Sequence, residues 1–390
     1  MTYSLVVIAM FAAFTWVAMA VAMIGNSLKI RQLQPIQGPI SVDLPEIDVV
    51  IPALNEEERI ETTINRILAQ EYPRLNITVI NDRSTDRTGE ILDRLAQSRP
   101  IRVIHGEPRP VGWVGKTWAV TQGAKGGKAE WLLFVDGDID LHPRAVATAI
   151  DQARKGNADL VSIIAWPEVK TFLQGAVAIT LGQALWTMYP LHKVNDPKSP
   201  VALAAGGFIL TKRSIYESIG GHEAVRAEIV EDIQLGKVIK RAGGRLSVHL
   251  APSLASTHMY GTFREIWVGL RKNAYAGTEY RLFTLATGLI GGLIMGWTPM
   301  IATIAGIALG SWPLALAGAF GWLAQIVAIV PSILYLRISP LFVFSLPVGV
   351  TLYVSIACSS AWHHFRGRIL WKDVTFASKE VREASRKTLS

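Results

Sequence analysis

The sequence predicts an α/β protein whose Rossmann-like, mostly parallel sheet is flanked by transmembrane segments at both ends of the chain. Between residues 45 and 280, short apolar runs alternate with segments of helix length. This alternation is typical of doubly wound sheets, in which helices cover both faces. Before and after this region lie apolar stretches that are long enough to cross a bilayer. We therefore expect a catalytic domain at 45–280 between membrane segments.

The first apolar stretch predicts an N-terminal membrane anchor at residues 1–26. Residues 3–24 carry no charge, and no basic segment of the kind found in signal peptides precedes them. Ala18-Met19-Ala20 leaves cleavage open, but we expect an uncleaved anchor. Lys29 and Arg31 follow directly, and positive residues stay on the cytoplasmic side. The sequence thus predicts an integral protein of the plasma or inner membrane, or of a thylakoid, with a cytosolic catalytic domain.

The second apolar region, residues 282–363, predicts about three further spans near 283–307, 313–335 and 340–362. Three spans would place the C-terminus outside, whereas the basic tail at 364–390 favours the inside and requires an even number of crossings. Glycines and Pro299 make the first segment the one expected to be re-entrant or split into two passes. Residues 171–191 form a further apolar stretch, for which we expect an interfacial helix or one packed on the apolar segments.

A cluster of acids at 136–140 marks the predicted site. Trp131 to Val135 read as a buried strand, and Asp136-Gly137-Asp138 follows it directly. Ligands bind beyond the carboxyl ends of such strands in open α/β sheets. Two carboxylates across a glycine turn can hold a hard divalent cation, Mg²⁺ or Mn²⁺, with positions left for a diphosphate. The alternative is an acidic loop that caps the helix after Pro143.

Other apolar runs predict strands at 47–53, 77–80, 101–104, 159–164 and 208–211. We expect Asn55 to cap a helix that runs to about Gln70, and Asp86 or Ser84 to cap a helix at 87–98. A further helix is predicted at 143–155, and another from the acids at 228–232 to about Arg241.

Lys116 is predicted to begin a helix, where a lysine and the helix dipole can meet an anionic ligand. Gly115-Lys116-Thr117 matches the end of a P-loop, but that motif requires glycine where this chain has Pro110. A P-loop ATPase is therefore disfavoured, and a solvated lysine is the remaining alternative.

Charge and cysteine content exclude some classes of protein. The net charge of +8 includes the tail next to the membrane, which suits anionic lipids, and no basic run is interleaved with aromatics as in nucleic-acid binders. We expect no nucleic-acid partner. The single cysteine, Cys358, excludes an intramolecular disulfide and a cysteine-based zinc site.

Several motifs in this order and spacing resemble the family 2 glycosyltransferases of the GT-A fold. They are Pro52-Ala-Leu-Asn55-Glu56, Asn81-Asp82-x-Ser84-x-Asp86, Asp136-Gly-Asp138 and Glu231-Asp232. A membrane-bound subgroup is closer still, namely the hopanoid-biosynthesis-associated glycosyltransferases, with similar patches in carotenoid glycosyltransferases. That likeness is carried by Gly112-Trp-Val-Gly-Lys116-Thr-Trp-Ala, Met188-Tyr-Pro, Val194-Asn-Asp-Pro197, Ala205-Gly-Gly207 and Trp371-Lys372.

The resemblance implies a role for each matching residue. Pro52, Ala53, Asn55 and Glu56 would line the nucleotide pocket, and Asp82 would bind the uracil edge of a UDP-sugar. Asp136 would lie near the ribose and the metal, with Asp138 on the metal and diphosphate and Lys116 on the diphosphate. Asp232 would be the general base, and Glu231, Gly206 and Gly207 would lie on the acceptor side.

One departure from the family concerns the segment after the base. Ceramide glucosyltransferases and cellulose synthases carry Gln/Arg-x-x-Arg-Trp there, whereas this chain reads Trp267-Val-Gly-Leu-Arg271-Lys272-Asn273. Arg271 is the proposed diphosphate contact, and processive polymerisation is disfavoured.

The function implied is inverting transfer of a sugar from a nucleotide-sugar to a lipid hydroxyl, with a hopanoid or carotenoid as the expected acceptor. Ceramide, diacylglycerol and polyprenyl phosphate are alternative acceptors. A lipid-binding protein on an inactive transferase fold and a nucleotidyltransferase are the alternatives from other classes. Successive side chains in a helix point about 100° apart, so we expect only one of Glu231 and Asp232 to face the donor. The alternative is that both acids only stabilise the positive end of the helix dipole, in which case neither would be catalytic.

Overall fold

The computed structural model describes residues 2–40, 43–257, 260, 262–366, 368–371 and 374–377. The chain divides into two units. The helical unit comprises residues 1–30, 169–190 and 260–362, and the sheet unit comprises 31–168, 191–259 and 363–390. Residues 169–190 and 260–280, which lie inside the predicted catalytic range of 45–280, therefore belong to the helical unit.

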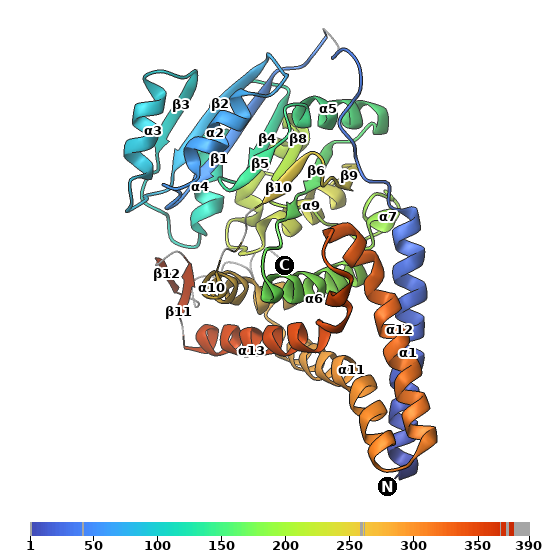
Figure 1. The fold of residues 1–390 in the computed structure, drawn as a ribbon. Coiled ribbons are helices and arrows are strands. Elements are labelled where there is room, and N and C mark those ends of the chain that lie inside the picture. The colour runs from blue at the N-terminus through green and yellow to red at the C-terminus, as the bar shows by residue number, and fades with distance from the viewer. Residues whose placement is uncertain are drawn as a thin grey trace. The chain divides into compact units, whose positions relative to one another are not determined.

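The sheet unit is built on a seven-stranded sheet in the order β3-β2-β1-β4-β8-β6-β9 (Figure 1). Its strands are β1 Ile47–Ala53, β2 Leu75–Asn81, β3 Ile101–His105, β4 Trp131–Val135, β6 Leu160–Ile164, β8 Phe208–Lys212 and β9 Leu246–Leu250. All neighbours pair in parallel except β8, which is antiparallel to both β4 and β6. The predicted mostly parallel sheet is confirmed, and β8 begins at the edge where β4 ends.

Two smaller sheets accompany the main one. A three-stranded sheet joins β5 Ile139–Leu141, β10 Ala255–Thr257 and β7 Trp166–Pro167, in that order. A two-stranded hairpin pairs β11 Arg368–Trp371 with β12 Val374–Ala377 within the predicted tail. Lys372, part of the last motif of the resemblance, lies outside the described residues.

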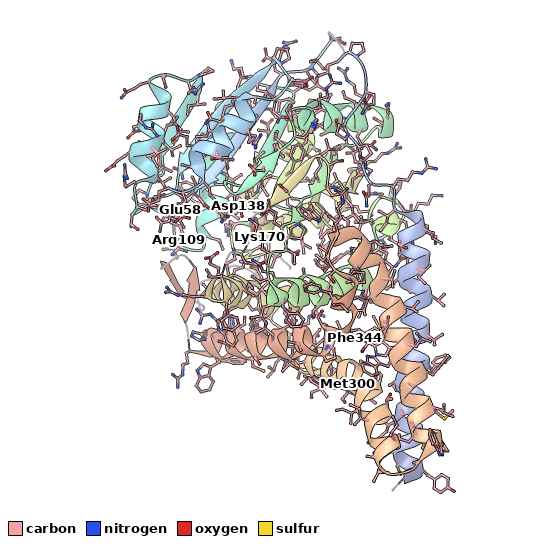
Figure 2. All side chains as sticks on the ribbon, viewed as in Figure 1. Glu58, Arg109, Asp138, Lys170, Met300 and Phe344 are labelled. Atoms are coloured by element: carbon pink, nitrogen blue, oxygen red, sulfur yellow. The ribbon has the colours of Figure 1, made fainter. Side chains whose placement is uncertain are left out.

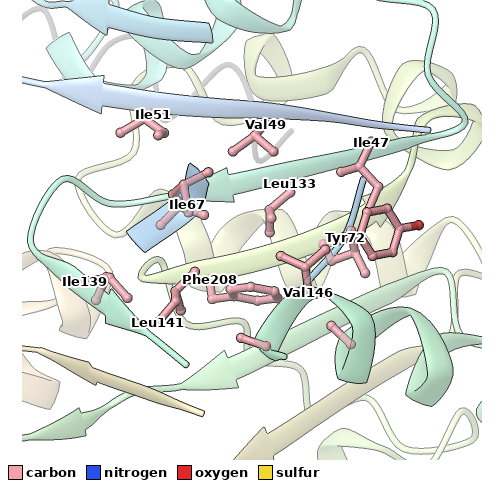
Figure 3. Packing of buried hydrophobic residues seen from close by; sticks show 14 of the residues in the cluster. Ile47, Val49, Ile51, Ile67, Tyr72, Leu133, Ile139, Leu141, Val146 and Phe208 are labelled. Carbon is pink, nitrogen blue, oxygen red and sulfur yellow. The ribbon is translucent and has the colours of Figure 1, made fainter. Parts of the chain in front are cut away.

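Alternate residues of the central strands face opposite layers of helices. Val49 and Ile51 of β1 share a fully buried cluster with Ile67 and Val146, and Figure 3 shows these side chains beside Leu133 of β4. On the opposite face, a Cβ at Gly123 would lie 2.6 Å from a methyl carbon of Val50, so glycine lets a helix pack directly on β1. Helices therefore cover both faces, as the alternating pattern predicts.

The helices of the sheet unit match most of the predicted ranges. They are α2 Ile60–Leu68, α3 Thr88–Ala96, α4 Gly115–Ala124, α5 Ala145–Gly156, α7 Leu191–Val194, α8 Arg213–Ser218, the 3-10 turn Gly221–Val225 and α9 Glu231–Arg241. The prediction that Asn55 caps a helix is wrong, because α2 begins five residues later and Asn55 has a φ of 50° in a loop. The prediction that Asp86 or Ser84 caps α3 is also wrong, because the N-cap is Arg87 and has no side-chain cap bond. Asp86 precedes it, and its Oδ1 accepts the backbone N–H of Thr88 at 3.0 Å.

The helical unit contains α1 Thr2–Lys29, α6 Phe172–Met188, α10 Phe263–Ala274, α11 Leu282–Ala308, α12 Trp312–Leu336 and α13 Leu346–Phe365, with 3-10 turns at Ala276–Thr278 and Pro340–Phe344. Small residues allow its long helices to approach closely, since a Cβ at Gly321 would lie 3.0 Å from Ala13 Cα. Gln183 of α6 donates to Ala328 O at 3.0 Å and to Ser332 Oγ at 3.2 Å. Helix α6 thus packs on α12, one of the two placements predicted for 171–191.

Within the residues that the structure describes, three helices are long and apolar enough to cross a membrane: Tyr3–Lys29, Leu282–Ala308 and Trp312–Leu336. Helix α11 runs without a break through its glycines and Pro299, so the expected split of this segment is wrong. Helix α13 is not among the three, although a span near 340–362 was expected. The 3-10 turn at Pro340–Phe344 takes up the start of that apolar run, and serines and histidines occupy the end of α13.

Candidate active site

One pocket lies where β1 and β4 end and β8 begins, and it is lined by six of the predicted site residues: Pro52, Lys116, Asp136, Gly206, Glu231 and Asp232. Pro52 is the penultimate residue of β1, Asp136 follows β4, and Gly206 precedes β8. Lys116 enters from the first turn of α4, and Glu231 and Asp232 enter from the first turn of α9. These side chains line one small pocket of about 10 Å³, together with Val120, Phe134, Ile209 and His222. A space of this size holds about one water molecule.

Lys116 is the centre of this cluster. Its Nζ lies 2.7 Å from Asp136 Oδ1 and 2.8 Å from Glu231 Oε1. Burial opposes the charge on Lys116, but Asp136, Glu231 and Asp232 together raise its pKa well above the usual value. Lys116 is therefore charged at neutral pH and balances part of a group of carboxylates.

Gly206 forms the wall behind the cluster. A Cβ built on it would lie 3.1 Å from Lys116 Nζ, 3.2 Å from Asp232 Oδ2 and 3.5 Å from Asp136 Oδ2. The backbone N–H of Gly206 also donates to Asp232 Oδ2 at 2.8 Å. Glycine thus lets the backbone touch the charged groups. Gly207 faces elsewhere, since its Cβ would meet Ile139 Cδ1 at 2.8 Å.

Both oxygens of the Asp232 carboxylate are held by the backbone. Oδ2 accepts from Gly206, and Oδ1 accepts the N–H of Ile233 at 2.8 Å. Burial, with a contribution from Glu231, raises the pKa of Asp232 to about 6, while Lys116 and the two backbone N–H groups oppose the rise. Asp232 is thus a stronger base than an ordinary aspartate, yet it is largely ionised at pH 7.

We expect turnover to depend on pH through Asp232. A base must be deprotonated to act, so activity should be full above about pH 7 and should fall roughly tenfold per pH unit below a pKa of about 6. The measurement is turnover at saturating substrates between about pH 4.5 and pH 8. The residual activity of Asp232→Asn serves as the control and should lack this acid limb. An acid limb that persists in the variant would assign the titration to another group.

Glu231 shares the pocket with Asp232, so the expectation that only one of them faces it is wrong. Both side chains come from the first turn of α9 and line the same pocket. Their partners differ, however. Glu231 is 7% exposed and pairs with the lysine, whereas Asp232 is held by backbone N–H groups and lies in the more open position.

Asp136 and Asp138 provide hard oxygen donors of the kind that Mg²⁺ and Mn²⁺ prefer. Burial raises the pKa of Asp136, and the charges of Asp138 and Glu231 add to the rise, while Lys116 opposes it. A divalent cation would relieve this repulsion, so the two carboxylates fit the predicted metal. Across the described part of the chain, no group of three or more His, Cys, Asp or Glu side chains is placed to hold a metal. Substrate oxygens would have to complete the coordination.

The two motif loops after β1 and β2 fix each other. Asn55 Oδ1 accepts the N–H of Thr85 at 2.8 Å, and Ser84 Oγ accepts the N–H of Asn55 at 3.0 Å. The N–H of Glu56 donates to Thr88 Oγ1 at 2.8 Å. The Asp136-Gly-Asp138 turn lies next to this pair of loops, since a Cβ at Gly137 would be 3.4 Å from Glu56 Cγ. Figure 2 shows Asp138, Glu58 and Arg109 at the same end of the sheet unit.

Asp82, the predicted uracil contact, is buried at the end of β2. Its N–H donates to Ala53 O at 2.7 Å, and its Oδ1 accepts from Arg83 at 2.6 Å. Burial raises the pKa of Asp82, against the hydrogen bond and charge of Arg83. A Cβ at Gly115 would lie 2.9 Å from Asp82 Oδ2, so this carboxylate also reaches the first residue of α4.

Arg271 is not among the residues brought together here. It lies on α10 of the helical unit, and its contact with the diphosphate stays a prediction.

His222 is a pocket residue that sequence reasoning missed. The Tyr216 hydroxyl accepts the backbone N–H of His222 at 3.1 Å and lies 2.8 Å from Nδ1 of the same residue. Burial lowers the pKa of His222 to about 4, which leaves the ring neutral at pH 7. A lone histidine in a 3-10 turn gives no periodic signal, so nothing in the sequence pointed to it.

Three further residues hold the loop that leads to Gly206. Ser162 Oγ accepts the N–H of Ala205 at 2.9 Å. The Asn195 side chain binds Val248 of the edge strand β9 twice: its Oδ1 accepts the N–H of Val248 at 2.7 Å, and its Nδ2 donates to Val248 O at 3.0 Å. Lys240 of α9 donates to Val194 O at 2.7 Å and Val201 O at 2.6 Å. The Val194-Asn-Asp-Pro197 motif therefore ties this loop to the helix that carries Asp232.

Comparison with known proteins agrees with the resemblance seen in the motifs. Residues 48–220 match the model of the family Glycosyl transferase family 2. The 4,4'-diaponeurosporenoate glycosyltransferase of Staphylococcus aureus (strain bovine RF122 / ET3-1) is 28% identical over 329 residues, which are 82% of this chain and 76% of that protein. The corresponding protein of strain USA300 is 28% identical over 245 residues. That match spans 61% of this chain and 64% of the relative, less than two thirds of its length.

A solved structure shows the same fold. The mannosyltransferase PcManGT from Pyrobaculum calidifontis, in complex with GDP-Man and Mn²⁺, aligns over 90% of this chain and 99% of its own, with a TM-score of 0.55 and 17% identity. The predicted GT-A fold is confirmed. Among the predicted site residues, Glu231, Asp232 and Arg271 lie beyond the family match at 48–220, and the others lie within it.

Proposed function

We propose that this chain, which carries a glycosyltransferase family 2 domain at residues 48–220, transfers a sugar from a nucleotide-sugar to a lipid hydroxyl with inversion. The observation that carries the proposal is the meeting of one lysine with Asp136, Glu231 and Asp232 at the carboxyl ends of β1 and β4. This arrangement supplies a cation for a diphosphate and, in Asp232, a base with a raised pKa for an acceptor hydroxyl.

In the proposed reaction, Asp232 accepts the proton of the acceptor hydroxyl. The acceptor oxygen forms its bond to the anomeric carbon as the bond from that carbon to the diphosphate breaks on the opposite face. Lys116, on the first turn of α4, stabilises the negative charge that develops on the leaving diphosphate. The backbone N–H groups of Gly206 and Ile233 keep the Asp232 carboxylate in place throughout. One base and direct displacement give inversion.

We assign Asp138 and Asp136 as the residues that would hold a divalent cation, Mg²⁺ or Mn²⁺. Such a cation neutralises the diphosphate when it is bound. The Mn²⁺ in the structural neighbour supports a metal in this fold, and the two carboxylates here are the matching donors. The donor is proposed to be a UDP-sugar read by Asp82. Inhibition of turnover by UDP but not by GDP would identify uracil, and the reverse would assign guanine, as in the GDP-Man of the neighbour.

An isoprenoid lipid, a hopanoid or carotenoid, is the proposed acceptor. The name of the 4,4'-diaponeurosporenoate glycosyltransferases supports this class, and so do the three helices able to cross a membrane. Ceramide, diacylglycerol and polyprenyl phosphate are the competing acceptors. The proposal thus commits to an isoprenoid lipid that reaches the enzyme from the bilayer.

Lipid analysis tests the acceptor. Cells that overproduce the protein should accumulate a lipid heavier by one hexose than its parent, and cells lacking the protein should lose that species. Overproduced Asp232→Asn is the matched control, because it keeps the membrane helices and lacks the base. Mass spectrometry of the extracts also identifies the parent lipid. A hexosylated ceramide or diacylglycerol would replace the isoprenoid assignment, and equal lipid profiles in all strains would contradict lipid glycosylation.

We propose a cytosolic sheet unit in a membrane crossed by α1, α11 and α12. After α1 the chain lies inside because of Lys29 and Arg31, and two further crossings return it to the inside at the basic tail. This count removes the parity conflict of three C-terminal spans.

Cysteine labelling tests the orientation. Single cysteines at the exposed positions Ser98 and Ser218, in a Cys358→Ala background, should resist an impermeant maleimide in intact cells and react after lysis. Labelling of either cysteine before lysis would reverse the proposed orientation. A cysteine placed at Gly310, between α11 and α12, is the positive control and should react in intact cells.

A further inference from the structure

We propose that Lys116 holds the place of the divalent cation in the donor-free enzyme and is displaced from Asp136 when the metal binds. The inference rests on the proposed function for the existence of a metal at Asp136 and Asp138. It adds a cation exchange: Lys116 pairs with Asp136 and Glu231 in the donor-free protein and with the diphosphate once the metal and donor are bound.

The first support is the geometry of the ion pairs. Lys116 Nζ makes two close contacts, at 2.7 Å to Asp136 and 2.8 Å to Glu231. Asp136 is one of the two carboxylates that fit the metal, so the ammonium occupies one of the donor atoms a metal would use. A metal ion and an ammonium cannot share one carboxylate oxygen at these distances without strong repulsion.

The second support is the lack of room. The pocket has a volume of about 10 Å³, close to that of one water molecule. Gly206 closes it from behind, with its Cβ position only 3.1 Å from Lys116 Nζ. Lys116 therefore occupies space beside Asp136 that a bound diphosphate would need.

The third support is that Lys116 has somewhere to go. Its backbone is fixed in the first turn of α4, where the N–H groups and the helix dipole favour an anion. Its side chain is a flexible chain of four carbons, so Nζ can leave Asp136 without movement of the helix. A bound diphosphate then replaces Asp136 as its partner.

The exchange has a thermodynamic consequence. Metal alone must break the Lys116–Asp136 contact, whereas metal with a nucleotide offers Lys116 a new partner. Metal and nucleotide should therefore bind cooperatively, and reciprocity requires each to strengthen the other by the same factor. Removing the ammonium removes the competitor. The metal should then bind more tightly without nucleotide, and the cooperativity should fall.

Calorimetry with Mn²⁺ and no nucleotide tests this on the full-length protein in detergent. Lys116→Met is expected to bind Mn²⁺ at least about tenfold more tightly than wild type. Lys125→Met is the matched control, because it removes the same charge from the exposed end of the same helix and should change the affinity less than about twofold. UDP should strengthen Mn²⁺ binding to wild type, and should do so by a smaller factor in Lys116→Met.

Equal Mn²⁺ affinity in wild type and Lys116→Met would contradict the exchange and leave the metal of the proposed function intact. Asp138→Asn should lose Mn²⁺ binding if the ion observed by calorimetry is the one held by Asp136 and Asp138. Failure of wild type and both lysine variants to bind Mn²⁺ would contradict both the metal and the exchange.

A second measurement uses only the wild-type protein, in case the variant does not fold. An amine-reactive reagent should modify Lys116 slowly, because two carboxylates hold its ammonium. Mn²⁺ should increase its modification severalfold, and Mn²⁺ with UDP should protect it again. Peptide mass spectrometry compares Lys116 with Lys125 in the same sample. Modification of Lys116 that does not respond to Mn²⁺ would overturn the inference.

Discussion

Asp232→Asn is expected to lower turnover by roughly 10² to 10⁴ while leaving nucleotide-sugar affinity nearly unchanged. The amide has almost the same shape, and its oxygen can still accept one of the two backbone N–H bonds that hold Asp232. It cannot accept the acceptor proton. The loss should therefore fall on the chemical step, and the measurement is turnover and donor affinity on folded, detergent-purified protein.

Glu231→Gln is the matched comparison. Glu231 is buried, and its Oε1 is already paired with Lys116 at 2.8 Å. We expect its amide variant to keep turnover within about tenfold of wild type, since the remaining Asp136 still holds the lysine. Near-normal turnover in Asp232→Asn would refute the base assignment, and a collapse in Glu231→Gln alone would transfer the role to Glu231.

Gly206→Val should reduce turnover by about 10² or more without unfolding the protein. Its Cβ alone would lie 3.1 Å from Lys116 Nζ and 3.2 Å from Asp232 Oδ2, and valine adds two further methyl groups beside these charged atoms. Displacement of a reacting group by about 1 Å costs a factor of this size. Gly206→Ala should have a smaller effect, because only the flexible end of Lys116 and one carboxylate need to shift.

The control for this series is Gly156→Ala at the end of α5, where a Cβ would meet nothing closer than Gln152 Nε2 at 3.9 Å. It should retain full turnover and an unchanged melting temperature. Turnover and thermal unfolding are measured for all three variants. Full activity in Gly206→Val would show that the wall of the pocket does not limit the reacting groups.

The strands and the acids at their ends could be predicted because they obey simple patterns. β1 and β4 are short apolar runs bounded by polar residues, and their length favours buried strands over helices. The helix starts at Lys116 and at Glu231 followed from the charges and glycines around them. The positions of Asp136, Lys116 and Asp232 in one pocket then follow from the common edge of the sheet.

Other features depend on contacts that sequence periodicity does not encode. Asn55 is a good capping residue by type, but the hydrogen bonds it makes with Ser84 and Thr85 are specific to two loops distant in sequence. His222 reaches the pocket through a 3-10 turn, and Lys240 acts through three backbone carbonyls. Glu231 and Asp232 share a pocket with Gly206, whose backbone N–H contacts Asp232 on α9. This contact between a loop and a helix cannot be predicted from the spacing of residues in the sequence.

The path of the chain has a consequence for producing a water-soluble form of this protein. The sheet unit is discontinuous in sequence. Residues 169–190, which contain α6, belong to the helical unit, and the chain returns to the sheet unit at 191, shortly before the loop to Gly206. Trimming both ends would therefore not yield a soluble catalytic domain. It would leave α6 without α12, with Ile179 and Gln183 stripped of the partners that bury them. Such a truncated protein should aggregate unless a short polar linker replaces 169–190.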